Sequence, residues 1–269
     1  MAEKGIRSTK IEDIFSVKDK VVLVVGVGGL GSVLAKGFAD NGAKMAIASY
    51  SQSHIDEVVG ECLARGVETR GYKVDVSDKA QAEEMVLTVG KDFGRIDILL
   101  YTSGIAPLGP SLDFDHDDFI RTMEVNFYGC VYVNAACGRI MQKNGWGRII
   151  NISSIDQFTV NCVDDLPYSA SKSAMAASTR HFAVDLATSG VTVNNIAPVW
   201  IWTPMMEQRP GDYMKQAAAT IPMARCAYPE DYLGICLYLA SDAGAYCTGQ
   251  TLLVDGGWSV YRAFQYSDE

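Results

Sequence analysis

A serine, a tyrosine and a lysine occur at spacings that suit proton transfer. Tyr168 and Lys172 are four residues apart in a segment of small residues that begins at Pro167, and proline favours the first turn of a helix. Residues at i and i+4 share a helical face, so the Lys172 ammonium is expected near the Tyr168 phenol. A neighbouring cation favours the ionised phenol, which predicts a lowered pKa for Tyr168 and a group able to act as acid and base.

The serine follows a predicted strand. Ser154 comes after the apolar run 148–152, which indicates a buried parallel strand. Its hydroxyl is therefore expected at the carboxyl end of that strand, the edge at which open α/β sheets bind ligands. The pattern Tyr-x-x-x-Lys alone has little specificity, so its weight depends on the elements around it.

Those elements alternate between strands and helices. Apolar and β-branched runs predict strands at 20–25, 44–49, 70–76, 96–101, 148–152 and 191–197. Helical patterns occupy 32–41, 55–65, 79–93, 117–139, 168–180 and 227–240. Alternation of this kind predicts an α/β protein with a parallel, doubly wound sheet.

Length and composition bound the possible functions. The 269 residues carry no linker, which favours one catalytic domain at 18–269 preceded by a surface arm at 1–17. A net charge of -9 from scattered acids disfavours nucleic acids and anionic membranes as partners. Seven cysteines without a Cys-x-x-Cys pair indicate free thiols in a reducing cytosol. No apolar run approaches the ~20 residues that span a bilayer, so a cytoplasmic protein is expected.

A glycine-rich segment follows the first predicted strand. Gly26, Gly28 and Gly31 form the pattern Gly-x-Gly-x-x-Gly between this strand and a helix. Glycines let the backbone approach a pyrophosphate, and the free N–H groups of the helix start attract its charge. This context predicts a dinucleotide site.

The end of the second strand bears on which dinucleotide binds. An acid there would bind the NAD ribose and repel the NADP phosphate, but Ser49, Tyr50 and Ser51 occupy these positions. The hydroxyls and His54 could bind a 2′-phosphate, whereas Ser49 could also accept a hydrogen bond from a ribose hydroxyl. The sequence favours NADP(H) and leaves NAD(H) open.

These features resemble a known family. A strand ending at Ser154 in Asn-Ile-Ser-Ser, a loop, and Tyr-Ser-Ala-Ser-Lys ending at Lys172 resemble the catalytic segment of the classical short-chain dehydrogenase/reductase family, and the resemblance covers about 18–259. The segment 125–129 resembles the family's internal asparagine motif. The resemblance implies that Tyr168 exchanges the hydroxyl proton, Ser154 polarises a carbonyl, Lys172 holds a ribose and Asn126 anchors a water relay.

The resemblance also supplies the last strand, within 249–257, and so predicts a single Rossmann domain with a seven-stranded parallel sheet. It implies the following cofactor-binding residues: Gly26, Gly28, Gly29, Leu30, Gly31, Ser49, Tyr50, Ser51, Asp75, Val76, Ser103, Gly104, Tyr168, Lys172, Pro198, Ile201 and Thr203. No metal site is expected.

Four residues and the length of the glycine loop depart from the family pattern. Val25 replaces a threonine before a glycine loop that is one residue shorter, and Val199 replaces a glycine. Tyr101 and Thr102 replace two asparagines, so the hydrogen bonds of those amides must be rebuilt or lost.

The predicted activity is NAD(P)-dependent interconversion of a secondary alcohol and a ketone, with the nicotinamide supplying the hydride. The alternative is a dinucleotide-binding sensor or scaffold that lost turnover. The segment 204–221 resembles a substrate lid. The substrate residues expected are Ser154, Asp156, Phe158, Tyr168, Trp200 and Met205.

Substrate identity stays open between two classes. The aromatic and Met side chains suit a hydroxysteroid or another cyclic ketone, whereas Asp156, Gln157 and Asn161 suit a polyol or sugar. The apolar C-terminal region and the resemblance predict a homotetramer.

Overall fold

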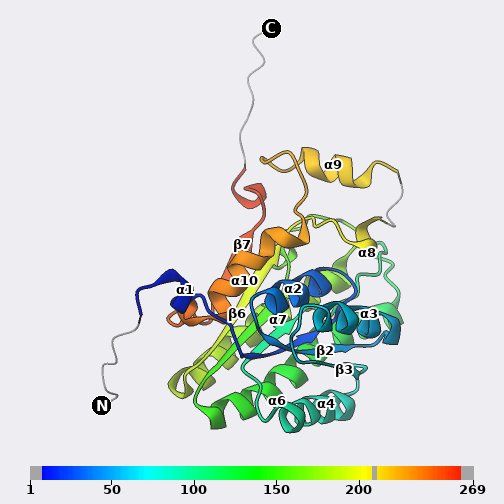
Figure 1. Ribbon diagram of the computed structural model, residues 1–269. Helices are drawn as coiled ribbons and strands as arrows, with labels where there is room; N and C mark the ends of the chain where they lie inside the picture. The colour runs from blue at the N-terminus through cyan, green and yellow to red at the C-terminus, as the bar shows by residue number, and fades with distance from the viewer. Residues whose placement is uncertain (1–7, 208–210, 262–269) are drawn as a thin grey trace.

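The computed structural model describes residues 8–207 and 211–261. Seven parallel strands form one sheet in the order β3-β2-β1-β4-β5-β6-β7 (Figure 1). The strands are β1 Val21–Val25, β2 Lys44–Ser49, β3 Thr69–Lys73, β4 Ile98–Tyr101, β5 Gly147–Ile152, β6 Val191–Pro198 and β7 Thr251–Val254. This arrangement confirms the predicted Rossmann-type fold with a seven-stranded parallel sheet.

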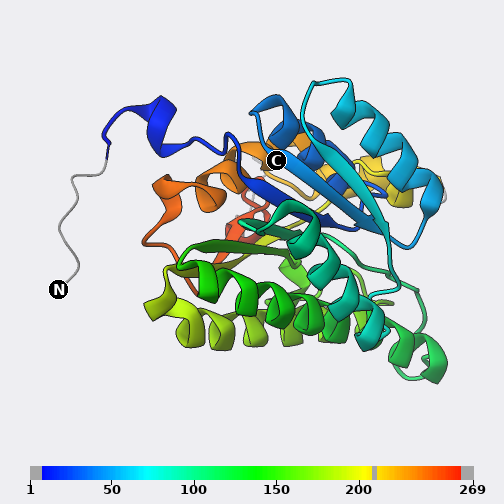
Figure 2. The ribbon, with the colours of Figure 1, turned by 60° about the horizontal axis from the view of Figure 1, so that its bottom comes forward.

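Helices cover both faces of the sheet. They are α1 Ile11–Ile14, α2 Leu30–Asp40, α3 Gln52–Leu63, α4 Lys79–Phe93, α5 His116–Thr122, α6 Gly129–Asn144, α7 Leu166–Leu186, α8 Pro204–Glu207, α9 Tyr213–Ala219 and α10 Leu233–Ala240. Helices α4, α6 and α7 pack on one face, and α2, α3 and α10 pack on the other (Figure 2). Every residue of β1, β5 and β6 is buried as a result, which explains the continuous apolar run of β1.

The sheet reverses its order of strand addition at β1, which pairs with both β2 and β4. Chain segments leaving the carboxyl ends of β1 and β4 therefore diverge and leave a crevice, the usual ligand site in such sheets. Gly26 N donates to Ala48 O at 2.8 Å and Thr102 N donates to Val25 O at 2.9 Å. These bonds hold the loops after β1 and β4 at the crevice.

The predicted continuous helix at 117–139 is wrong in one respect. A π-helical turn, Met123–Tyr128, separates α5 from α6. The buried Tyr101 hydroxyl donates to the carbonyl oxygen of Val125 at 2.7 Å, which gives a carbonyl of the widened turn a partner outside its own helix. The replacement of an asparagine by Tyr101 is thus matched by a new hydrogen bond from β4 to this turn.

Other predicted boundaries shift as well. The predicted strand 70–76 ends at Lys73, after which Val74 N still donates to Ser49 O at 2.9 Å. The predicted helix 227–240 becomes a short 3₁₀ turn, Pro229–Tyr232, followed by α10. Proline at the first position of that turn is consistent with a helix start rather than a helix interior.

Candidate active site

Strand β5 and helix α7 bring the serine, the tyrosine and the lysine together. Lys172 Nζ lies 5.4 Å from the centroid of the Tyr168 ring and donates to the carbonyl oxygen of Ile152 at 2.8 Å. The lysine is only 3% exposed. Because Ile152 ends β5 two residues before Ser154, this bond ties the cation of α7 to the strand that delivers the serine.

The pKa values of the pair differ from the expectation. Burial raises the pKa of Tyr168, the charge of Asp156 raises it further, and a hydrogen bond with Ser154 opposes both. Burial lowers the pKa of Lys172 to about 8. The expected lowering of the tyrosine pKa by the lysine is therefore not found, because desolvation disfavours the charged form of both groups.

Ser154 is paired with an acid. Its hydroxyl donates to Asp156 Oδ2 at 2.6 Å, and the two residues are 6% and 7% exposed. Burial raises the pKa of the Asp156 carboxyl, although the hydrogen bond from Ser154 lowers it. Asp156 was expected to face the substrate, and the structure shows in addition that it holds the serine hydroxyl.

Asn126 lies in the π-helical turn and its side chain is fully engaged. Its Oδ1 accepts from Ile105 N at 2.8 Å, and its Nδ2 donates to Ile105 O at 2.9 Å and to Ser171 Oγ at 3.0 Å. The amide thereby joins the loop after β4 to α7, beside the tyrosine and the lysine. Sequence reasoning did not identify Ser171, whose small polar type is common in helices.

The glycine loop is shaped for a close backbone approach. Gly26 has a φ of +95°, and a Cβ there would lie 2.6 Å from Ser103 N. At Gly31 a Cβ would collide with the carbonyl oxygen of Gly26. The Thr102 hydroxyl is hydrogen-bonded to the carbonyl oxygens of Val25, at 3.1 Å, and Gly26. Thr102 therefore supports the shortened loop in place of an asparagine.

The residues present fit a dinucleotide pyrophosphate. Helix α2 begins after Gly29 with no side-chain cap and no acid in its first turn, so the N–H groups of its start, apart from that of Ser32, which donates to Gly29 O at 3.0 Å, are available to an anion. Across from this loop, a Cβ on Gly29 would lie 3.5 Å from Thr203 Cβ, and a Cβ on Gly28 would lie 3.3 Å from His54 Nδ1. The loop after β1, which contains Gly29, and the segment after β6, which contains Thr203, thus meet at the crevice. Leu30 is the first residue of α2.

The predicted ribose segment lies at the end of β2. Ser49 is its last residue and is buried, whereas Tyr50 is exposed. The Ser51 side chain accepts from His54 N at 3.4 Å, which caps α3. The segment 49–51 therefore lies at the end of the strand that pairs with β1. One lone pair of the Ser51 hydroxyl accepts the capping hydrogen bond.

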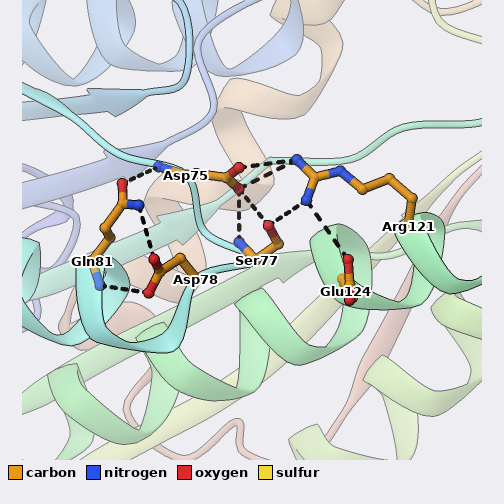
Figure 3. Close-up of polar contacts among 6 residues, drawn as sticks. All are labelled: Asp75, Ser77, Asp78, Gln81, Arg121 and Glu124. Carbon is orange, nitrogen blue, oxygen red and sulfur yellow. Dashed lines mark hydrogen bonds and ion pairs between the residues drawn. The ribbon is translucent and has the colours of Figure 1, made fainter.

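Asp75, one of the predicted cofactor-binding residues, belongs to an ionic cluster (Figure 3). Arg121 Nη2 lies 3.1 Å from Asp75 Oδ2, and Ser77 donates to Oδ1 from its N–H, at 3.0 Å, and from its hydroxyl, at 2.6 Å. Partial burial opposes ionisation, but the hydrogen bonds from Ser77 and Arg121 lower the pKa of Asp75. Arg121 also pairs with Glu124 of the π-helical turn at 3.7 Å. Sequence reasoning missed Arg121, which no local motif marks.

The remaining predicted cofactor residues lie along the same edge. Val76 is buried after Asp75, and Ser103 contacts the glycine loop. A Cβ on Gly104 would lie 3.6 Å from Lys172 Nζ. Pro198 ends β6, and Ile201 pairs with Ala227 in an isolated bridge that precedes Thr203.

A cavity of about 150 Å³ adjoins Ser154 and Tyr168. Trp200 and Tyr213 form one wall, with ring centroids 5.4 Å apart in an edge-to-face contact. The lining residues are Ala106, Leu108, Ser154, Asp156, Asn161, Cys162, Asp165, Tyr168, Val199, Trp200, Ile201, Thr203, Met206 and Tyr213.

Phe158, a predicted substrate residue, is 60% exposed and is not part of the lining of this cavity. The side chain of Met205 lies outside the described part of the chain, and its neighbour Met206 lines the cavity. Gln157 turns back into the protein, where its Nε2 donates to Ser153 Oγ at 2.9 Å.

Within residues 8–207 and 211–261 no helix is long and apolar enough to cross a bilayer. Over the same ranges, no cluster of three or more His, Cys, Asp or Glu side chains could hold a metal ion.

Comparison with known proteins gives consistent matches over most of the chain. Residues 26–259 match a family model described as enoyl-(acyl carrier protein) reductase. The chain is 33% identical over 257 residues to sorbose reductase from Candida albicans, covering 93% of this chain and 91% of that protein. It is 32% identical over 262 residues to an NADP-dependent mannitol dehydrogenase from Alternaria alternata, covering 94% and 97%. The solved structure of NAD⁺-bound xylitol dehydrogenase matches with a TM-score of 0.84 at 29% identity, covering 89% of this chain and 99% of that one.

The matches and the fold agree with the arrangement of Ser154, Tyr168 and Lys172 at the carboxyl edge of the sheet. The chain belongs to the short-chain dehydrogenase/reductase family.

Proposed function

We propose that this protein is an NAD(P)-dependent oxidoreductase that interconverts a secondary alcohol and a ketone of the polyol or sugar class. The observation that carries the proposal is that Ser154 and Tyr168 line one small cavity together with acids, while Lys172 lies beside the Tyr168 ring. A nicotinamide cofactor, when bound, supplies or accepts the hydride. The chain's own residues handle the proton and the orientation of the substrate.

Tyr168 is the proton donor in ketone reduction and the acceptor in alcohol oxidation. Its raised pKa keeps the phenol protonated near neutrality, as a donor requires. Lys172, with a pKa of about 8, carries charge over part of the physiological range next to the tyrosine ring. The side-chain amide of Asn126 already makes hydrogen bonds with Ile105 and Ser171. We therefore assign the backbone carbonyl of Asn126 to a water relay.

Cavity size and charge favour small hydroxylated substrates. A volume of about 150 Å³ is below the range of roughly 300–1,000 Å³ typical for drug-sized ligands, which disfavours a steroid. Asp156, Asn161 and Asp165 line the cavity, and its described lining contains no Lys or Arg. Carboxylates accept hydrogen bonds from hydroxyls and repel anionic substrates, including phosphate-bearing acyl carriers. The sorbose, mannitol and xylitol enzymes among the matches support this class.

For the cofactor, we propose that NADP(H) is accepted and preferred over NAD(H). Ser49 at the end of β2 places no negative charge against a 2′-phosphate, and His54 lies next to Gly28. The matched enzymes include an NADP-dependent and an NAD⁺-bound member, which is consistent with either dinucleotide.

The proposal extends to the surroundings of the site. We assign the segment 204–221 as a cover over the substrate, because α8 and α9 carry Met206, Tyr213 and Met214 and pack in a separate small apolar cluster. We also propose a cytoplasmic homotetramer. A monomeric mass by light scattering at micromolar concentration would contradict the tetramer.

The test is nicotinamide absorbance on incubation with a panel of polyols and ketoses, with steroids and 3-oxoacyl compounds as comparison substrates. We expect turnover of a neutral polyol–ketose pair with at least one of the two dinucleotides. Tight dinucleotide binding without turnover of any substrate would instead favour the sensor or scaffold alternative, which the intact Ser154, Tyr168 and Lys172 disfavour.

A further inference from the structure

The π-helical turn Met123–Tyr128 withdraws a hydrogen-bond donor from one of its carbonyls. At the end of the turn, Gly129 N donates to the carbonyl oxygen of Glu124, five residues back. In an α-helix the same N–H would donate four residues back, to the carbonyl oxygen of Val125. The Tyr101 hydroxyl donates to that oxygen instead, at 2.7 Å. Tyr101 thus supplies the donor that the π register takes away.

The surroundings of Tyr101 favour this contact. Tyr101 ends β4 and is fully buried. A Cβ on Gly129 would lie 2.8 Å from the Tyr101 hydroxyl oxygen and 2.9 Å from the carbonyl oxygen of Val76, so a glycine at 129 is what lets the hydroxyl reach the turn. Burial raises the pKa of Tyr101, and the hydroxyl therefore keeps its proton and remains a donor.

The residue after Val125 connects the same turn to the catalytic helix. Asn126 is fully buried, and its Nδ2 donates to Ser171 Oγ of α7 at 3.0 Å. The Ser171 hydroxyl in turn donates to the carbonyl oxygen of Tyr168 at 2.7 Å. The turn is therefore bonded to β4 through Val125 and to α7 through Asn126. A return of the turn to the α-helical register would shift Asn126 relative to α7.

We infer that Tyr101 is a positioning residue: its hydroxyl holds the turn in the π register, which places the backbone carbonyl of Asn126 for the water relay. The inference rests on the proposed function, which assigns that carbonyl to the relay. Tyr101 acts through Val125 and exchanges no proton with the substrate. The family pattern has an asparagine at this position, so this support is a feature of the present chain.

The kinetic test uses Tyr101→Phe, which removes the hydroxyl and keeps the buried ring. kcat should fall by about five- to twentyfold, the factor that loss of one buried hydrogen bond can produce, and it should fall in both directions of the reaction. The dissociation constant of the dinucleotide, measured by fluorescence titration, should stay within about twofold of wild type. The solvent deuterium isotope effect on kcat should rise, because a slower proton relay limits turnover to a greater extent.

Tyr72→Phe is the matched control. The Tyr72 hydroxyl donates to Asp92 Oδ2 at 3.0 Å, and Tyr72 is not part of the cavity lining. This variant should keep the wild-type kcat and isotope effect. An unchanged kcat in Tyr101→Phe overturns the inference. A lower kcat with weaker dinucleotide binding and no rise in the isotope effect, as a general loosening of the fold would give, also overturns it.

A second measurement needs neither turnover nor cofactor. Amide hydrogen exchange of residues 124–130 reports the local opening of the turn, and urea unfolding reports the stability of the whole fold. In Tyr101→Phe these amides should exchange faster than in wild type, whereas in Tyr72→Phe they should not. Unchanged exchange in Tyr101→Phe contradicts the link between the hydroxyl and the turn. Absence of turnover in wild type, by contrast, contradicts only the proposed function.

Discussion

Lys172 Nζ is bonded to the carbonyl oxygen of Ile152 at 2.8 Å, and this contact joins helix α7 to the end of strand β5. The bond fixes where Tyr168, one helical turn before the lysine, stands relative to Ser154, two residues after the strand. Lys172 is only 3% exposed. The Ile152 carbonyl accepts a hydrogen bond from its ammonium and so offsets part of the cost of burying that charge. The activity of Tyr168 and the stability cost of Lys172 both depend on this contact.

Tyr168→Phe should lower kcat by about 10²-fold or more in both directions, because it removes the only atom placed to exchange the substrate proton in the proposed mechanism. Dinucleotide binding, measured by fluorescence titration, should stay near the wild-type value. Tyr228→Phe is the control, since Tyr228 is exposed and lies outside the cavity lining. Turnover near that of wild type in Tyr168→Phe would rule out the proposed proton donor.

Lys172→Met should stabilise the protein while it removes activity. The folded pKa of Lys172 is about 8 against a reference of 10.5, so the unfolded chain binds the extra proton between these values. The contribution of Lys172 to the free energy of unfolding should therefore rise with pH from about 8, because the cost of burying the ammonium disappears as it loses its proton. Buried cysteines with raised pKa values contribute the opposite slope in this range, so the Lys172 contribution is the difference between wild type and Lys172→Met. At pH 7 the gain in Lys172→Met should be about 1 to 3 kcal/mol, reduced by the lost bond to Ile152.

Urea unfolding between pH 7 and 9.5 checks this, below the range in which tyrosines ionise. The slope attributed to Lys172 should be absent in Lys172→Met and present in Lys73→Met, in which an exposed lysine is changed. A lower stability of Lys172→Met at pH 7 would show that the bond to Ile152 outweighs the desolvation of the charge.

Local patterns were sufficient to predict much of the sheet and the pairing of Tyr168 with Lys172. Strands at 44–49 and 148–152 are mostly apolar because both faces of the sheet are covered, and i,i+4 spacing requires only a helix. The π-helical turn was not predicted, because it depends on a hydroxyl of β4 meeting the Val125 carbonyl, a contact between segments 24 residues apart in sequence.

Tertiary burial explains the other differences. The phenol of Tyr168 was expected to have a lowered pKa from its neighbour's charge, but desolvation, which no spacing reveals, reverses the shift. Arg121 reaches Asp75 across 46 residues of chain, and Phe158 turns outward although its type suits a pocket. The departures at Tyr101 and Thr102 were recognisable in the sequence, while the bonds that compensate for them required coordinates.

Ser49→Asp should shift cofactor preference toward NAD. Ser49 ends β2 and is buried beside the glycine loop, so a carboxylate there would repel a 2′-phosphate and accept from the NAD ribose. The ratio of kcat/KM values for NAD and NADP should change by about ten- to a hundredfold, or roughly 1 to 3 kcal/mol. Ser53→Asp, on the exposed start of α3, is the charge-matched control. An unchanged ratio in Ser49→Asp would place the ribose elsewhere.

Thr102→Val should weaken dinucleotide binding with a smaller effect on kcat. The Thr102 hydroxyl is bonded to the carbonyl oxygens of Val25 and Gly26 and supports the shortened glycine loop from β4. Valine has nearly the same shape without the hydroxyl, so the Gly26 carbonyl loses a partner at a cost of about 1 to 2 kcal/mol. This cost is divided between the free energy of folding and that of cofactor binding. The dissociation constant of the dinucleotide should therefore rise by up to about tenfold. Calorimetry with each dinucleotide measures it.

Thr102→Ser separates the hydroxyl from the packing of the methyl group. Serine retains the donor, so it should restore most of the affinity lost in Thr102→Val. If Thr102→Ser binds as weakly as Thr102→Val, the methyl contact rather than the hydrogen bonds supports the loop. If both variants bind like wild type, the glycine loop keeps its shape without Thr102, and the β4 segment has no part in holding the pyrophosphate site.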